Sequence, residues 1–112
     1  MGHPSDKALC EQVLLRLARL RSIGAQRLLG LPEEEHETIF VQGQHARLSV
    51  IREPSVGGGA VVVVQGFLPT WSRPTFISLT SLQVGRLVAE GLVVGPQGEI
   101  TDAPDHVMWD FR

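Results

Sequence analysis

The chain has 112 residues, of which 43% are hydrophobic and 20% are charged, and its formal net charge is −2. This composition is typical of one soluble domain with one core, so we predict a single domain over residues 1–112. The negative balance excludes a basic field over the whole domain, although a local basic patch stays open. Cys10 is the sole cysteine, which excludes an intrachain disulfide and a cysteine-cluster zinc site. Because no signal-peptide pattern or membrane-length apolar run is present, we expect a cytoplasmic protein with no membrane partner.

Residues 6–29 have the clearest helical pattern. Leucine and valine recur at helical spacing and predict a core-facing stripe of Leu9, Val13, Leu17, Leu20 and Leu28. Gly24 lowers helix stability and is the candidate break between a long and a short piece. Arg16, Arg19 and Arg27 lie on another face. Such a face is usually solvated, but it is also an alternative basic surface for an acidic partner or a phosphate.

Strand-like spacing follows the helix. "PEEEHE" (32–37) concentrates carboxylates that repel one another, which predicts a solvated loop. Residues 37–43 and 45–53 then alternate as two short strands, which indicates a hairpin. "AVVVVQGFL" (60–68) is the strongest strand, because four consecutive valines favour β structure buried on both faces. We therefore predict that it is a central strand.

The glycines at 57–59 invite comparison with a phosphate-binding loop. That motif requires a lysine followed by serine or threonine and then a helix, whereas a valine strand follows here. We interpret the glycines as a hairpin turn.

"PTWSRP" (69–74) is predicted to be a loop, because each proline restricts the residue before it to an extended shape. An aromatic residue beside an arginine in a loop can stack on a base or hold a peptide, and it can also fold back over the sheet as a lid. The candidate binding residues are Arg47, Arg52, Trp71 and Arg73.

The last third reads as strand, helix, hairpin and tail. "TFISL" (75–79) is strand-like, and Thr80 with Gln83 fits a capping box, so we predict a short helix that ends at Gly91. Residues 92–101 indicate a hairpin across a glycine-rich turn. In the tail, the alternation of Val107, Trp109 and Phe111 predicts a last strand or an extended arm that docks on the body.

No set of residues indicates catalysis or metal binding. Cys10 lies within the apolar side of the first helix, where a buried and inert thiol is expected. Asp102, Asp105, His106 and Asp110 form the best polar cluster, but no ligand set of defined geometry can be assembled from them. We therefore predict a non-enzymatic protein with no catalytic residue, no metal and no cofactor.

"IREP" (51–54) and "FISLTSLQVGRL" (76–87) resemble the PC4-like transcriptional coactivators. The matched residues are Ile77, Ser78, Leu79, Thr80, Gln83 and Leu87. The resemblance implies a curved sheet followed by a helix, a dimer, and single-stranded DNA bound on the sheet. The chain departs from the family at Thr75-Phe76, where Lys-Gly is typical, and lacks the usual lysine-rich segment.

"SLQVGRLVAEGLVVGPQGEI" (81–100) is also similar to the recognition helix and wing of winged-helix proteins. That fold needs another helix before the recognition helix. A strand and a Trp-Pro loop are predicted in that place here.

The order of elements predicts an α+β domain with a long N-terminal helix packed on an antiparallel sheet of about five strands, a short second helix, and a C-terminal strand or arm. A small sheet has edges to cover, so a homodimer is expected. The first functional hypothesis is a non-enzymatic small binding or regulatory module that acts through protein–protein contacts. The alternatives are a nucleic-acid-binding protein and a small-ligand-binding protein. Steep weakening of binding with salt would separate nucleic acid from protein as the partner.

Overall fold

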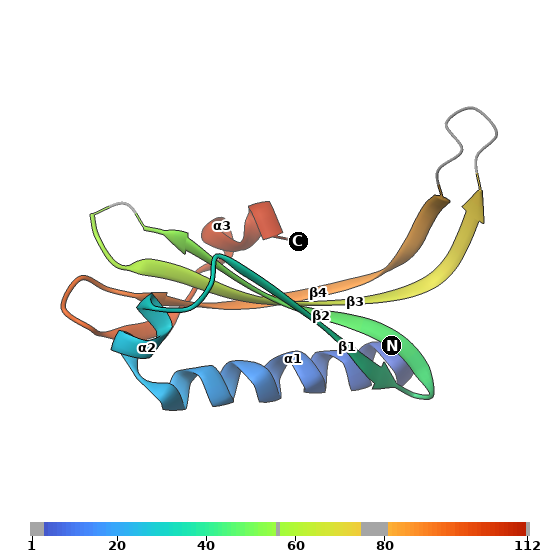
Figure 1. Cartoon of the computed structure of the whole chain (residues 1–112), viewed down its shortest axis with the longest axis horizontal. Helices are drawn as coiled ribbons and strands as arrows, with labels where there is room; N and C mark the ends of the chain where they lie inside the picture. Colours follow the sequence, from blue (N-terminus) through green and yellow to red (C-terminus); the bar gives the residue numbers. More distant parts are fainter. Residues whose placement is uncertain (1–3, 56, 75–80, 112) are drawn as a thin grey trace.

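The computed structural model describes residues 4–55, 57–74 and 81–111, with side-chain positions for residues 7–55, 57–69, 85–109 and 111. The described residues form an α+β fold around a five-stranded antiparallel sheet in the order β1-β2-β3-β4-β5 (Figure 1). Helices α1 and α2 pack on one face of the sheet, and α3 packs on the other. The predicted α+β class, with its long N-terminal helix and antiparallel sheet of about five strands, is therefore confirmed, and the short second helix of the structure is α2 (Ala25–Leu29). Among the described residues, no helix combines the length and apolar character needed to cross a membrane.

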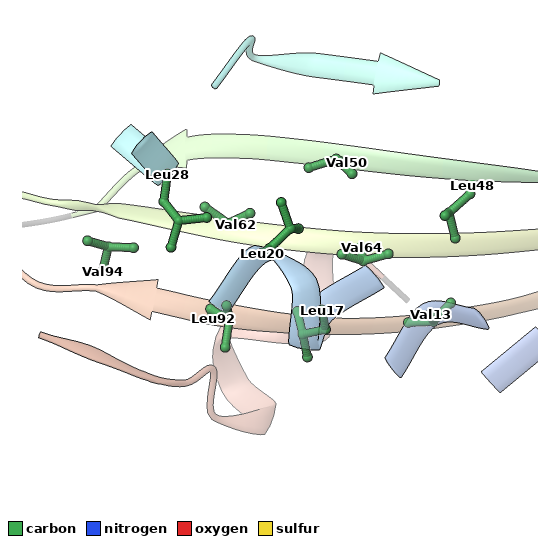
Figure 2. Close-up of a cluster of buried hydrophobic side chains, with 10 residues drawn as sticks. All are labelled: Val13, Leu17, Leu20, Leu28, Leu48, Val50, Val62, Val64, Leu92 and Val94. Carbon is green, nitrogen blue, oxygen red and sulfur yellow. The ribbon is translucent and has the colours of Figure 1, made fainter. Parts of the chain in front are cut away.

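The N-terminal helical segment is divided in two, as its sequence predicts. Helix α1 (Pro4–Ile23) and helix α2 (Ala25–Leu29) are separated by Gly24, which has a φ of 91°. That left-handed backbone is accessible to glycine at little steric cost, so the chain turns there without strain. The predicted stripe is buried, and most of it lies in the cluster of Figure 2: Val13, Leu17, Leu20 and Leu28.

Strand β3 (Ala60–Pro74) lies in the middle of the sheet, as predicted. Val62 and Val64 point toward α1, where they join the cluster of Figure 2. Val61 and Val63 point to the opposite face and pack under α3. All four are buried, because helices cover both faces of the sheet at this point.

Strands β1 (Glu34–Val41) and β2 (Gln44–Pro54) form the predicted hairpin. Its turn residues, Gln42 and Gly43, have φ values of 53° and 77°. Two positive φ values are typical of the tight turns that match the twist of paired strands. The loop predicted over residues 32–37 is wrong, because β1 already begins at Glu34. Carboxylates are tolerated there since β1 is an edge strand with solvated side chains.

The helix predicted between Thr80 and Gly91 is wrong. Residues Ser81–Val94 form strand β4, which pairs antiparallel with β3 from Ala60↔Val94 to Pro74↔Ser81. The capping pattern is a local signal worth about 1 kcal/mol, whereas a long ladder supplies many backbone hydrogen bonds and buries valine side chains. The PC4-like and winged-helix resemblances both need a helix over this segment, so neither holds.

Strands β3 and β4 continue beyond the rest of the sheet as a two-stranded arm. Strand β2 pairs with β3 only as far as Phe67, so the described part of the chain adds no third strand to the arm. The loop predicted over residues 69–74 is therefore wrong, because these residues are the end of β3. A shift of register between Pro69 and Trp71 marks a bulge, and the arm curves toward the face that carries α3 (Figure 1). The strand predicted over residues 75–79 lies outside the described residues.

The C-terminal segment returns across the sheet. The predicted hairpin over residues 92–101 is confirmed, since β5 (Ile100–Asp102) pairs with the end of β4. Next come α3 (Asp105–Met108) and the short 3-10 turn η1 (Trp109–Phe111), so the strand or extended arm predicted from alternation at Val107, Trp109 and Phe111 is wrong, although the tail does dock on the sheet. In helical turns, Met108 and Phe111 face the sheet, whereas Trp109 is 72% exposed.

Candidate binding surfaces

Part of the sheet face that carries α3 is covered by no described helix or strand. Helix α3 and turn η1 cover the part formed by Val61 and Val63 but do not extend over the part nearer the arm. Five cross-strand neighbours on β1 to β4 form what we name the open face: Phe40, His45, Arg47, Phe67 and Leu87. They share a face because successive side chains along a strand point to opposite sides of the sheet.

The open face is apolar and aromatic, with one cation. Phe40 is 67% exposed and Leu87 is 46% exposed. The rings of Phe40 and His45 lie 4.5 Å apart between centroids, with 44° between their planes. The Cζ atom of Arg47 lies 5.9 Å from the ring centroid of Phe67, within range of a cation–π attraction. A shallow cavity of about 210 Å³ lies beside Arg47 and Phe67.

Only part of the predicted binding set is placed on this surface. Arg47 belongs to the open face. Arg52 points to the α1 side, where its Nε donates a hydrogen bond of 2.7 Å to the carbonyl oxygen of Leu31. Its role is to tie β2 to the segment that follows α2. Trp71 and Arg73 lie in the arm part of β3, and their side chains lie outside the described residues.

The alternative basic surface on α1 does not form a basic stripe. Arg16 Nη2 lies 2.6 Å from Glu37 Oε2 on β1, so the carboxylate neutralises this cation. A groove of about 480 Å³ lies between α1 and β1, and both Arg16 and Arg19 line it. Arg27 is exposed on the separate helix α2. The groove therefore has mixed charge, which does not favour a polyanion.

A hydroxyl, an imidazole and a carboxylate lie in sequence on β1 and β2. The Nδ1 of His36 lies 2.7 Å from Ser49 Oγ, and its Nε2 lies 3.2 Å from Glu34 Oε1. Catalytic triads have the same order: a nucleophilic hydroxyl, a histidine base and a carboxylate that orients the histidine. However, Ser49 is buried, and at this residue β2 pairs with β1 on one side and β3 on the other. The backbone N–H of Ser49 is therefore engaged in the sheet and cannot stabilise the oxyanion that an attack by the hydroxyl would create. The contact instead satisfies a buried hydroxyl.

The C-terminal polar cluster does not form a metal site in the described part of the chain. Asp102 is an ion-pair partner of Arg21 on α1, and His106 lies in α3. Among the described residues, no group of three or more histidine, cysteine or acidic side chains is placed to hold a metal ion. Cys10 is half-buried rather than fully buried on α1.

The two edges of the sheet differ in their protection. Strand β1 carries Glu34, Glu35 and Glu37, and like charges along an edge repel a second strand. Strand β5 pairs with β4 only over Leu92–Val94. Along Gly85–Glu90, the described chain places no strand beside the outer edge of β4. The sheet is therefore protected by charge on one side and open on the other.

Most of the open face was not found by sequence reasoning. Phe40 and Phe67 lie inside predicted strands. The alternation of side chains indicates which face of the sheet each residue is on, but it does not indicate which part of that face the C-terminal segment covers. Leu87 lies in the segment before Gly91 whose sequence predicts a helix. No protein-family model, curated protein or solved structure matched the chain. Its surfaces are therefore the basis for proposing a function.

Proposed function

We propose that the protein is a non-enzymatic interaction module, acting as a homodimer, and that a protein partner docks on the open face. The observation that supports this is the exposure of Phe40 and Leu87 beside Arg47 on a sheet face that no other described element covers. Aromatic residues and arginine are enriched among the residues that dominate binding energy in protein interfaces. The proposal keeps the cytoplasmic location predicted from the sequence.

The chemistry of the open face selects a partner segment with an apolar side chain next to a carboxylate. The open face contains no acidic residue, and Arg47 supplies a planar guanidinium that can pair with a carboxylate in two hydrogen bonds. Phe40 and Leu87 supply exposed apolar area on either side. An aromatic or aliphatic side chain beside Asp or Glu would match both.

Nucleic acid is the second candidate, because rings on a sheet beside an arginine can stack on unpaired bases. The charge supports it less well. The open face carries one arginine in a chain of net charge −2, whereas binding of nucleic acid normally neutralises several phosphates. A small ligand is supported least. The shallow cavity beside Arg47, of about 210 Å³, is smaller than typical ligand pockets of roughly 300–1,000 Å³. The larger groove between α1 and β1, of about 480 Å³, is lined by the Arg16–Glu37 ion pair, whose charges already neutralise each other.

Selection from a random peptide library displayed on phage tests the proposal. Peptides enriched on the wild-type protein are expected to share an apolar residue next to Asp or Glu. Phe40→Ser and Arg47→Ala should each weaken a selected peptide by at least tenfold, which corresponds to about 1.4 kcal/mol, measured by fluorescence anisotropy. The matched control is Leu15→Ser, because Leu15 is 63% exposed but lies on α1, away from the open face.

The proposal fails if no peptide is enriched, or if Phe40→Ser binds as well as the wild type. An oligo-dT strand is the parallel probe. If it binds at low salt, weakens steeply as salt rises and loses affinity in Arg47→Ala, the nucleic-acid alternative replaces the proposal.

A further inference from the structure

We infer that a second copy of this chain pairs with the outer edge of β4, antiparallel and in a register centred on Val88. This inference rests on the homodimer of the proposed function and assigns its interface. The two sheets would join through β4 and its symmetry mate. A two-fold axis would pass between the two Val88 residues, as in closed dimers in which the same surface is used twice.

The backbone of β4 presents the hydrogen-bonding groups that such a pairing needs. Ala103 donates to the Gly91 carbonyl oxygen at 2.9 Å, so the polar groups of Gly91 point away from β3. Backbone direction alternates along a strand, so the N–H and C=O groups of Gly85, Leu87 and Ala89 point the same way. Within the described chain, β5 stops short of these residues. They form a template for another strand.

The charges on β4 favour one register over its neighbours. Centring on Val88 places Arg86 opposite Glu90 of the second copy, and Glu90 opposite Arg86 of the second copy. Opposite charges directly across a strand pair stabilise it, whereas like charges destabilise it. A shift of the centre by one residue, to 87 or 89, would place an apolar residue opposite both Arg86 and Glu90. A shift to residue 86 would face Arg86 with itself, and a shift to residue 90 would face Glu90 with itself. The Val88 register also places Leu87 opposite Ala89, where both residues can exchange backbone hydrogen bonds.

The position of α1 leaves room for the second copy. A Cβ at Gly66 would lie 2.8 Å from Leu9 Cδ1 and 2.9 Å from Val13 Cγ2, so α1 crosses directly over β3 at this point. Gly66 pairs with Val88, so at the level of the proposed two-fold axis α1 lies one strand back from the edge. In the dimer the two α1 helices would then stand three strand spacings apart, about 14 Å, and would not collide.

The flank of α1 that faces the β4 edge is apolar at its middle. Arg21 pairs with Asp102 on β5, which shows that its side of α1 faces the β4–β5 end of the sheet. Leu14 lies seven residues before Arg21, two helical turns away, and therefore projects from the same side. Leu14 is exposed. In the dimer, both Leu14 side chains would flank the central Val88 pair and lose contact with water.

The described part of the arm does not obstruct this arrangement. Residues before Gly85 would run toward β5 of the second copy if β4 stayed flat. The bulge between Pro69 and Trp71 lies next to the Pro69↔Gly85 pair, and from there the arm leaves the plane of the sheet (Figure 1). The part of the β4 edge that no described strand covers, Gly85–Glu90, contains Val88 with Arg86 and Glu90 on either side of it.

Charge reversal tests the register. Arg86→Glu and Glu90→Arg each place like charges at both ends of the interface, so each variant alone should sediment as a monomer in analytical ultracentrifugation. An equimolar mixture should recover the dimer, because every facing pair is then of opposite sign. Circular dichroism of each variant checks that it is folded. If Arg86 and Glu90 only stabilised the fold of their own chain, mixing the two variants would not restore the dimer.

Disulfide trapping gives an independent readout of the same register. In a Cys10→Ser background, Val88→Cys should form a covalent dimer under mild oxidation, because facing residues of this kind have Cα atoms about 4.5 Å apart, within disulfide range. Arg86→Cys mixed with Glu90→Cys should cross-link, whereas each alone should cross-link far less. Thr38→Cys, an exposed residue on β1, is the matched control and should stay monomeric.

The outcomes separate this inference from the proposal on which it rests. A dimer that neither charge reversal weakens, and that Val88→Cys does not trap, overturns the β4 register while the homodimer stands. If the wild-type protein is monomeric at every concentration, both the interface and the homodimer are overturned. The edge of β4 would then be a site for a strand from another protein. Peptide binding at the open face is measured separately and is decided by neither result.

Discussion

Met108→Ala is expected to lower the free energy of unfolding by about 2–5 kcal/mol, the usual cost of truncating a fully buried methionine. Met108 is 0% exposed, and its sulfur would lie 2.9 Å from a Cβ on Gly91, so it rests directly on the backbone of β4. Its loss leaves a cavity between α3 and the valines of β3. A domain of this size is usually stable by about 5–15 kcal/mol, so the change is a large fraction of the total.

Urea denaturation followed by circular dichroism measures this effect. Trp109→Ala is the control, because the neighbouring Trp109 is exposed and its truncation should change stability by less than about 0.5 kcal/mol. An extended tail with Trp109 in the core would reverse the order of the two variants. That reversal would contradict the helical tail and the boundary of the open face with it.

Gly59→Ala is expected to destabilise the protein by more than about 3 kcal/mol, because two costs add at this position. The φ of Gly59 is 79°, and a side chain in the left-handed region costs roughly 1–2 kcal/mol. A Cβ at Gly59 would also overlap the carbonyl oxygen of Val94, which is backbone and cannot turn aside. The strands β3 and β4 would have to separate where their pairing begins.

Gly57→Ala is the matched control for this prediction. Gly57 has a φ of 87°, but a Cβ there would meet no atom within 4 Å, so only the conformational cost applies. Thermal unfolding should therefore show a much larger fall in Tm for Gly59→Ala than for Gly57→Ala. Equal effects would mean that Gly59 does not approach Val94 as closely as the fold requires.

The candidate site was predictable only in part, and the reason is the range of the forces that form it. Arg47 is predictable because its strand is recognisable from local alternation. Phe40, Phe67 and Leu87 become a surface only because α3 and η1 stop short of them. The sequence predicts Arg52 as a binding residue, but its hydrogen bond to the Leu31 carbonyl ties it into the fold. The neighbours of a residue along the chain do not determine whether a distant segment covers its side chain.

Local patterns were sufficient for the elements whose own residues decide their state. The leucine stripe of α1, the break at Gly24, the valine strand at the centre of the sheet and the two hairpins all follow from spacing, glycine conformation and burial preference. Tertiary structure decided the segment Ser81–Val94 and the tail. In Ser81–Val94, the hydrogen-bonded ladder with β3 outweighed the local helix signal. In the C-terminal segment, the burial of Met108 and Phe111 against the sheet favoured helical turns over a strand. Contacts between residues far apart in the chain carry more free energy there than the local propensities that they oppose.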